Sequence, residues 1–372
     1  MCIRNKIKSF LLGIVLSGLF GGAFAADVSQ YDFYPLHFTY IGKADSAIQK
    51  VEWDNLMKYK VFGTTGIDFL GGNINIPDKV GWFGSSKGSW TMKNEKHRVG
   101  GPILIGGNVS FEDGMDSILT GPTRILNGVS AGQNFASKVN FVEGDVCIAN
   151  GTINSGFVNL VGNDHRYFAG GKGYNNCPST GPEGVPQVNT NLAIPVSDEK
   201  FENYYRNDRS LIFDANNGGK SVHSGAIYID DMTGYIDVPK CEGMTEEECE
   251  ASVYDLYVPE LHLKNNSRLV VRMPSGGRYT RIFIEGTFEI TANPHIQVVY
   301  MDESATYDET THTWSGASSP IQNNKYMGNL LFYAKGDMRW PALVPEDSIQ
   351  GTFISQGTIH IEQQMTLATT GE

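Results

Sequence analysis

The feature that most constrains this chain is a run of alternating apolar and polar residues between Leu261 and Tyr300. Apolar residues recur at every second position, which is the period of a β-strand with one buried face. β-Branched and aromatic residues dominate, and Gly or Pro interrupts each run, so a helix is disfavoured. The apolar positions Leu261, Leu263, Leu269 and Val271 are matched at a constant spacing by Ile282, Ile284, Ile290 and Ala292. Because coiled β-sheets repeat after about 20 residues, we expect an all-β fold, specifically a parallel β-solenoid.

Glycine-led segments of similar length precede this run. Gly101, Gly121 and Gly144 begin comparable segments, which follow one another at nearly the same spacing. Such a spacing is expected of successive turns of a solenoid, with Gly at corners where φ is positive. The polar stretches 170–220 and 301–325 break the pattern, and we expect them to form side insertions. A short helix is predicted over 197–207, where it would cover strand edges.

The segment 1–25 has the three parts of a cleavable export signal. Basic residues at positions 4, 6 and 8 precede an apolar core over 10–20, which is too short to span a membrane. The small residues Ala23 and Ala25 fit a cleavage site, so the mature chain is expected to begin at Ala26. We expect a secreted or cell-surface protein with no membrane span in the mature chain. Its domain organisation is expected to be a capping segment, 26–58, followed by one solenoid domain, 59–372, that contains an insert at 170–253.

The charge of the chain limits its partners. The net charge is −12, and removal of the three basic residues of the signal takes it to −15. A balance of this sign argues against nucleic acid and against anionic membrane surfaces. We therefore expect the partner to be a polysaccharide or another surface macromolecule.

Several short segments resemble the choice-of-anchor A domain family of secreted bacterial surface proteins. The segments are Tyr59–Gly63, Gly106–Asn108, Leu269–Pro274, Asn329–Ala334 and Ser348–Gly357. The resemblance implies a surface-associated β-helical module, and it implies neither an enzymatic activity nor catalytic residues. The insert at 170–253 departs from the family pattern.

Two Asp- and Asn-rich segments are candidates for a calcium site, because calcium prefers oxygen ligands. Asp214 and Asn216 resemble the front half of a calcium loop that lacks its distal Glu, and an Asx-rich surface turn is the alternative. Asp230 and Asp231 could gather with Asp237 at a strand edge. The histidines show no paired spacing for a transition metal. We expect no obligatory cofactor, with calcium as the one candidate.

Four tryptophans are candidates for stacking on sugar rings: Trp82, Trp90, Trp314 and Trp340. The alternative is that they fill the ends and corners of the solenoid.

An arginine-rich stretch raises the question of catalysis. Four arginines, at 268, 272, 278 and 281, lie close in sequence to Glu260 and Glu285. Polysaccharide lyases and glycoside hydrolases need such groups to converge on one face. However, the alternation that directs Val271 inward directs Arg272 to solvent, as on a solvated face. We therefore predict a non-enzymatic module for adhesion or polysaccharide binding, with a polysaccharide-degrading β-helix enzyme as the alternative.

The four cysteines of the mature chain generate a testable prediction. Cys147, Cys177, Cys241 and Cys249 are an even number in an oxidising compartment, at spacings that do not suit a metal. Four carboxylates lie between Cys241 and Cys249, and their repulsion favours covalent closure. We predict bridges 147–177 and 241–249, the shorter contributing on the order of 2–3 kcal/mol. Non-reducing peptide mapping tests this pairing, and free thiols or a 177–241 linkage would contradict it.

Overall fold

The structure, a computed structural model, describes residues between 59 and 362 with gaps, the longest of which are 169–212, 321–329 and 341–349. Nearly all regular structure in this part is β-strand, so the predicted all-β class is confirmed. Of the described residues, Glu248 has a helical conformation. The helix predicted over 197–207 lies outside the described residues.

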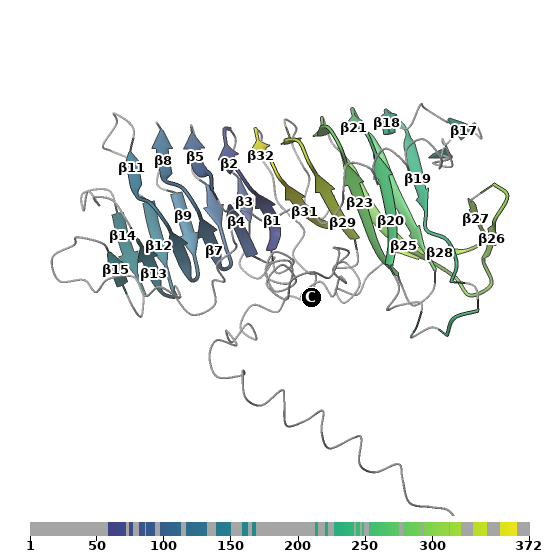
Figure 1. Cartoon of the computed structure of the whole chain (residues 1–372), viewed down its shortest axis with the longest axis horizontal. Helices are drawn as coiled ribbons and strands as arrows, with labels where there is room; N and C mark the ends of the chain where they lie inside the picture. The colour runs from purple at the N-terminus through teal and green to yellow at the C-terminus, as the bar shows by residue number, and fades with distance from the viewer. Residues whose placement is uncertain are drawn as a thin grey trace, which may run out of the picture.

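Most strands belong to parallel sheets that run side by side along one axis (Figure 1). Sheet A has the order β15 (Arg166–Phe168), β13 (Val146–Ile148), β10 (Thr123–Ile125), β7 (Ile103–Ile105), β4 (Trp82–Ser85), β1 (Tyr59–Gly63), β31 (Thr352–Ser355), β29 (Leu330–Ala334), β23 (Tyr279–Ile284) and β20 (Val253–Val258). Sheet B has the order β11 (Val129–Ala131), β8 (Val109–Glu112), β5 (Ser89–Lys93), β2 (Gly66–Phe69), β32 (Thr358–Ile361), β30 (Met338–Trp340), β24 (Phe288–Ile290), β21 (Leu261–Lys264) and β18 (Ile227–Asp230).

Two shorter sheets lie beside opposite parts of sheets A and B. The five-stranded sheet has the order β14 (Val158–Val161), β12 (Val139–Val142), β9 (Ser117–Thr120), β6 (Arg98–Val99) and β3 (Asn75–Ile76). The four-stranded sheet has the order β19 (Thr233–Asp237), β22 (Arg268–Met273), β25 (His295–Met301) and β28 (Ser318–Pro320), the last antiparallel to β25. Two antiparallel hairpins complete the fold, β16 (Phe213–Asp214) with β17 (Lys220–Ser221), and β26 (Thr306–Asp308) with β27 (Thr313–Ser315).

The chain does not pass through this stack from one end to the other. It begins in the middle with β1 and β2, and strands up to β15 proceed toward one end. Strands from β18 onward start at the opposite end and return to the middle, so that β31 pairs with β1 and β32 with β2. We call this contact the seam, and Figure 1 shows it where the purple and yellow strands lie side by side.

Strand register confirms the spacing predicted from three glycines. In the aligned strands β7, β10 and β13, the positions Ile103, Thr123 and Val146 are equivalent. Gly101, Gly121 and Gly144 stand at the same place before these positions and have φ values of 95°, 93° and 69°. These corners therefore need glycine for its access to positive φ.

The register predicted for the alternating run is wrong. Leu261 is aligned with Phe288 and Leu269 with Ile296, so the true repeat is longer than the predicted one. Ile282, the predicted partner of Leu261, belongs to sheet A, whereas Leu261 belongs to sheet B. Each repeating unit there contains three strands, and in all three apolar residues recur at every second position. Pattern matching alone therefore aligned a strand with the wrong sheet.

Burial distinguishes sheet A from sheet B. Every side chain of β7 and β29 is buried, so sheet A is covered on both faces and its strands read as continuous apolar runs. In β18 of sheet B, Ile227 and Ile229 are buried while Tyr228 and Asp230 are exposed. Sheet B therefore has one apolar face toward the core and one polar face toward solvent.

A stack of aromatic rings fills the core beneath the seam. The ring of Phe353 lies 5.2 Å from that of Phe332 at an interplanar angle of 4°, and Phe332 lies 5.3 Å from Phe288. Trp340 contacts Phe353 edge-on at 5.1 Å. Since Phe353 is aligned with Val61 across the seam, this stack joins the first strands of the fold to the last.

Removing the central ring of this stack should destabilise the whole fold. We expect Phe353→Ala to lower the free energy of unfolding by about 3–5 kcal/mol, the usual effect of truncating a buried Phe. Val161→Ala is the matched control, because Val161 is 53% exposed and its truncation should change stability by less than about 0.5 kcal/mol. Urea unfolding followed by tryptophan fluorescence measures both, and equal effects would contradict the assignment.

Candidate functional site

The outer face of sheet B has one row of polar side chains that crosses six adjacent strands. We call it the polar row: Tyr228, His262, Glu289, Arg339, His360 and Asp68. Each member is aligned in register with the next. At the usual separation of neighbouring strands, the row is about 24 Å long. The row runs along the axis of the stacked strands and is perpendicular to each strand.

Local alternation explains why these side chains face outward. His360 lies between Ile359 and Ile361, which are both buried in the core. Beyond Asp68 the row continues as hydroxyl side chains, with Thr91 and Ser110 at the aligned positions of β5 and β8. The charged and aromatic part thus lies over β18 to β2, and the hydroxyl part over β5 and β8.

One end of the row is organised around His262. Its ring stacks on that of Tyr228 at 4.7 Å and an interplanar angle of 5°. His262 Nε2 lies 3.0 Å from Glu260 Oε2, and its Nδ1 lies 3.3 Å from Glu289 Oε2. The Tyr228 hydroxyl donates to the same Glu260 oxygen at 2.7 Å. These bonds hold an aromatic ring and two carboxylates in a fixed relation at the surface.

The hydrogen bonds at this end shift two pKa values in opposite directions. The bond from Tyr228, followed by that from His262, lowers the pKa of Glu260 because both stabilise its ionised form. The same Tyr228–Glu260 bond raises the pKa of Tyr228, since ionisation of the phenol would remove the donor. At neutral pH the pair is therefore a neutral phenol that donates to a carboxylate.

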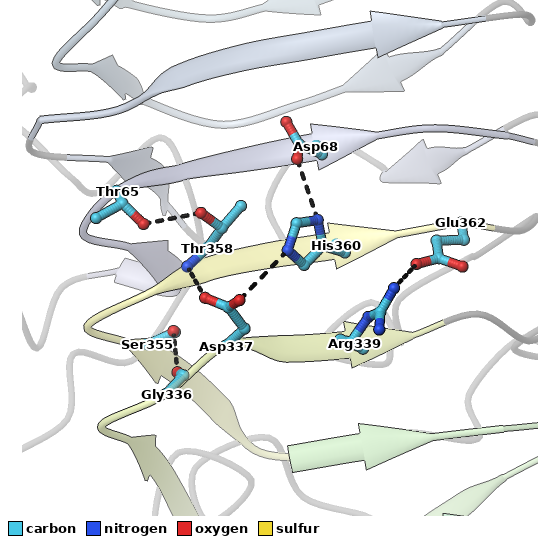
Figure 2. Close-up of polar contacts among 9 residues, drawn as sticks. All are labelled: Thr65, Asp68, Gly336, Asp337, Arg339, Ser355, Thr358, His360 and Glu362. Carbon is cyan, nitrogen blue, oxygen red and sulfur yellow. Dashed lines mark hydrogen bonds and ion pairs between the residues drawn. The ribbon is translucent and has the colours of Figure 1, made fainter. Parts of the chain in front are cut away.

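At the other end of the row, polar contacts cross the seam, as Figure 2 shows. His360 Nδ1 lies 3.0 Å from Asp68 Oδ2, and its Nε2 lies 3.7 Å from Asp337 Oδ2. Asp337 Oδ1 accepts the backbone N–H of Thr358 at 2.8 Å. The hydroxyls of Thr65 and Thr358 lie 2.8 Å apart. His360 therefore links a carboxylate from the first strands of the fold to one from the last.

Arg339 lies between the two histidine clusters on the same face. Its Nη2 donates to Glu362 Oε1 at 3.2 Å (Figure 2). The Arg339 side chain is 53% exposed. The face thus combines an arginine, two histidines, a tyrosine and several carboxylates without enclosing them.

Of the candidate calcium ligands, Asp230, Asp231 and Asp237 are not brought together at one site. Asp230 accepts a hydrogen bond from Asn265 Nδ2, and Asp231 accepts one from Asn266 Nδ2 at 3.4 Å. Asp237 lies on the four-stranded sheet, away from that turn. Asp214 lies on β16, and position 216 is outside the described residues. In the described ranges there is no group of three or more His, Cys, Asp or Glu residues that could hold a metal ion.

Of the two alternatives for the tryptophans, burial rather than stacking on sugar rings holds for three of the four. Trp90 and Trp340 are fully buried among core residues. Trp314 is buried beside the β26–β27 hairpin, where its Nε1 donates to the Val238 carbonyl at 2.6 Å. Trp82 lies on β4. Large aromatic side chains gain most from burial, which is why the rings of Trp90, Trp314 and Trp340 are in the interior.

The arginine-rich stretch is distributed over different sheets. Arg272 was predicted to point to solvent, but it makes a bidentate ion pair with the buried Asp237 and lies 4.3 Å from the centre of the Tyr235 ring. Arg281 is buried on sheet A. Glu260 belongs to the outer face of sheet B, so these arginines do not converge with it.

Two of the predicted disulfide cysteines are described, and both are disulfide-bonded: Cys147 and Cys241. Cys177 and Cys249 lie outside the described residues, so the pairing stays a prediction.

The segment after Cys241 contains a feature that the sequence analysis missed. Thr245 Oγ1 accepts the backbone N–H of Glu248, and the Glu248 carboxylate accepts that of Thr245, which is the capping box of a helix start.

Sequence reasoning missed the polar row itself. Tyr228 lies between two isoleucines, and the alternation there was sufficient to predict its exposure. The alignment of Asp68 with His360 could not be found in this way, because the two residues lie near opposite ends of the chain and meet at the seam.

Comparison with family models, with curated proteins and with solved structures finds no match to this chain. Across the described ranges we find no helix with the length and apolar character needed to cross a lipid bilayer.

The Tyr228–Glu260 bond leads to a spectroscopic prediction. We expect the Tyr228 phenol to ionise above its ordinary pKa of 10.0, because the bond to Glu260 favours the neutral form. Replacing the acceptor by Glu260→Gln should bring the ionisation to lower pH. The measurement is the phenolate absorbance during alkaline titration, taken as the difference between the parent protein and Tyr228→Phe. An unchanged difference curve in Glu260→Gln would show that the bond is absent in solution.

Proposed function

We propose that this protein is an exported, non-enzymatic surface or matrix module that binds a polysaccharide along the polar row. The observation that supports this proposal is the polar row, in which each of six neighbouring strands supplies one polar or aromatic side chain. Tyr228 is 44% exposed, and its ring is held by the stack on His262. An exposed ring beside planar polar groups suits a sugar, which has both apolar ring faces and hydroxyl groups.

The direction of the row favours a polymer over a single sugar. A ligand that lies along the stack meets a new side chain at every strand, over roughly 24 Å. Binding energy from several weak contacts then accumulates along one chain. The ion pairs and hydrogen bonds within the row fix its side chains beforehand, which reduces the entropy cost of binding.

The proposed architecture is a β-solenoid with the chain wound from the middle outward and back. Support comes from the parallel register of successive strands and from positive-φ glycines at equivalent corners. Membership of the choice-of-anchor A family and removal of the segment 1–25 on export are parts of the same proposal. They rest on the short motifs and on the signal-like N-terminus described above.

A polysaccharide-degrading enzyme is the second candidate, because His360 lies beside two carboxylates, Asp68 and Asp337. Carboxylates and a histidine on one exposed face are groups that acid–base catalysis uses. Against this reading, Arg339 is bonded to Glu362 and the predicted arginine cluster is dispersed.

A glycan array probed with the chain from 26 to 372 tests the binding proposal. We expect a polysaccharide signal that Tyr228→Ala and His262→Ala weaken roughly tenfold, because removal of a stacking ring typically costs about 1–3 kcal/mol. Glu303→Ala is the control, since Glu303 is exposed near the β26–β27 hairpin and away from sheet B. Release of reducing ends from any bound polymer would favour the enzyme instead, and absence of binding to every glycan would refute the proposal.

A further inference from the structure

We infer that the capping segment 26–58 docks on the outer face of sheet A, which points away from the core, and buries it. Both faces of sheet A are buried, whereas the core lies on only one of them. The docking surface is on a different sheet from the polar row, so it is independent of the proposed polysaccharide binding.

The docking surface is one row of residues that follows sheet A from strand to strand. We call it the outer row: Phe283, Tyr333, Ile354, Phe62, Gly84, Leu104, Arg124 and Cys147. Each member is aligned in register with the next, and the row crosses the seam between Ile354 and Phe62. At the usual separation of neighbouring strands, the row is about 34 Å long.

The core does not account for the burial of the outer row. Apart from Gly84 and Arg124, every member of the row is at most 2% exposed. The core cluster contains their neighbours on the same strands, such as Val61, Phe332 and Phe353, but no member of the row. Because successive side chains of a strand point to opposite faces, the row points away from the core and another part of the protein must cover it.

Polar groups on this face are shielded from water as well. Arg124 is 5% exposed, and Arg281, which lies beside the row on β23, is fully buried. Burial lowers the pKa of Arg124 and raises that of Tyr333, because both groups lose contact with water. Buried guanidinium groups need acceptors around them. The covering segment must therefore combine apolar side chains with hydrogen-bond acceptors.

The point at which the capping segment joins sheet A favours it as the cover. The segment leads directly into Tyr59, the first residue of β1, next to the seam. The Tyr59 ring contacts that of Phe62 edge-on at 4.9 Å, and a Cβ at Gly84 would collide with it. The chain thus enters the fold on the outer face of sheet A, near the middle of the outer row.

The length and composition of the capping segment also fit. Its 33 residues would span about 50 Å as a helix and more when extended, so they can cover the row in either form. Six of the 33 are aromatic, a larger share than the 11% of the whole chain. They are Tyr31, Phe33, Tyr34, Phe38, Tyr40 and Trp53. Carboxylates at positions 27, 32, 45, 52 and 54 are suitable acceptors for buried arginines.

Two other stretches outside the described ranges enter or leave strands near the row, 321–329 and 341–349. Each has nine residues, which span at most about 32 Å when fully extended. Each must also connect two strands, β28 to β29 and β30 to β31. Neither is therefore long enough to cover the whole row.

Photo-cross-linking in the full chain tests the docking. Phe62→benzoylphenylalanine and Tyr333→benzoylphenylalanine place a photoreactive ring at two points of the outer row. The ring forms a bond only with groups in contact with it, within about 4 Å. We expect cross-linked peptides from 26–58 in both variants. Tyr228→benzoylphenylalanine is the matched control, because Tyr228 is exposed on the outer face of sheet B, and that product should be lost.

Oxidative footprinting of the unmodified chain is a second measurement, which does not depend on the folding of a variant. We expect hydroxyl radicals to oxidise Phe38 and Trp53 several-fold more slowly in the native chain than in urea, because docking buries them. Met232 and Met244 are 40% and 50% exposed, so their oxidation should differ little between the two states.

Three results would overturn the docking of 26–58. Cross-links from both positions to 169–212 would identify a different segment of the same chain as the cover. Cross-linked dimers would show that a second copy of the chain covers the face. Oxidation of Phe38 and Trp53 at the same rate in the native chain and in urea would show that the capping segment is not docked at all.

Discussion

The fold depends on the parallel pairing of its first strands with its last. Without β1·β31 and β2·β32, the strands up to β15 and the strands from β18 onward would be two separate stacks, each with open strand edges. Three kinds of interaction meet at this seam. Backbone ladders run through both sheets, the Phe353–Phe332 ring stack lies beneath, and the His360–Asp68 contact lies above. The candidate site shares the seam, so its geometry depends on the same pairing.

Burial of sheet A on both faces determines where function can lie. An apolar sheet covered on each side contributes stability, and it offers little polar surface for recognition. Sheet B, by contrast, alternates strictly, and each strand supplies an outward side chain whose position is fixed by two buried neighbours. Recognition on such a surface is a matter of repeated contacts at strand spacing. It is therefore suited to a long ligand rather than to a molecule that must be enclosed.

Much of the local structure could be predicted from the sequence, because strand alternation and corner glycines are local signals. The segments Tyr59–Gly63 and Asn329–Ala334, which were singled out in the sequence, contain β1 and β29, and the spacing of Gly101, Gly121 and Gly144 matches the register. Register between strands of identical pattern could not be predicted, and Leu261 was matched to a residue on another sheet. The sequence also left open whether the tryptophans are exposed or buried, since side-chain type does not reveal which face of a strand is inward. The polar row required the alignment of Asp68 with His360 across the seam, which no local pattern contains.

The seam also determines when the fold can be completed. A polypeptide is synthesised from its N-terminus, so β1 and β2 exist long before their partners do. In a linear repeat each new unit docks on the one before it, and a shortened product is simply a shorter stack. Here, a chain that stops before Thr352 has two unsatisfied edges in the middle of the molecule, where pairing with another chain is the hazard. Only a chain that has been synthesised through to β32 can therefore pair the open edges of β1 and β2 within one molecule.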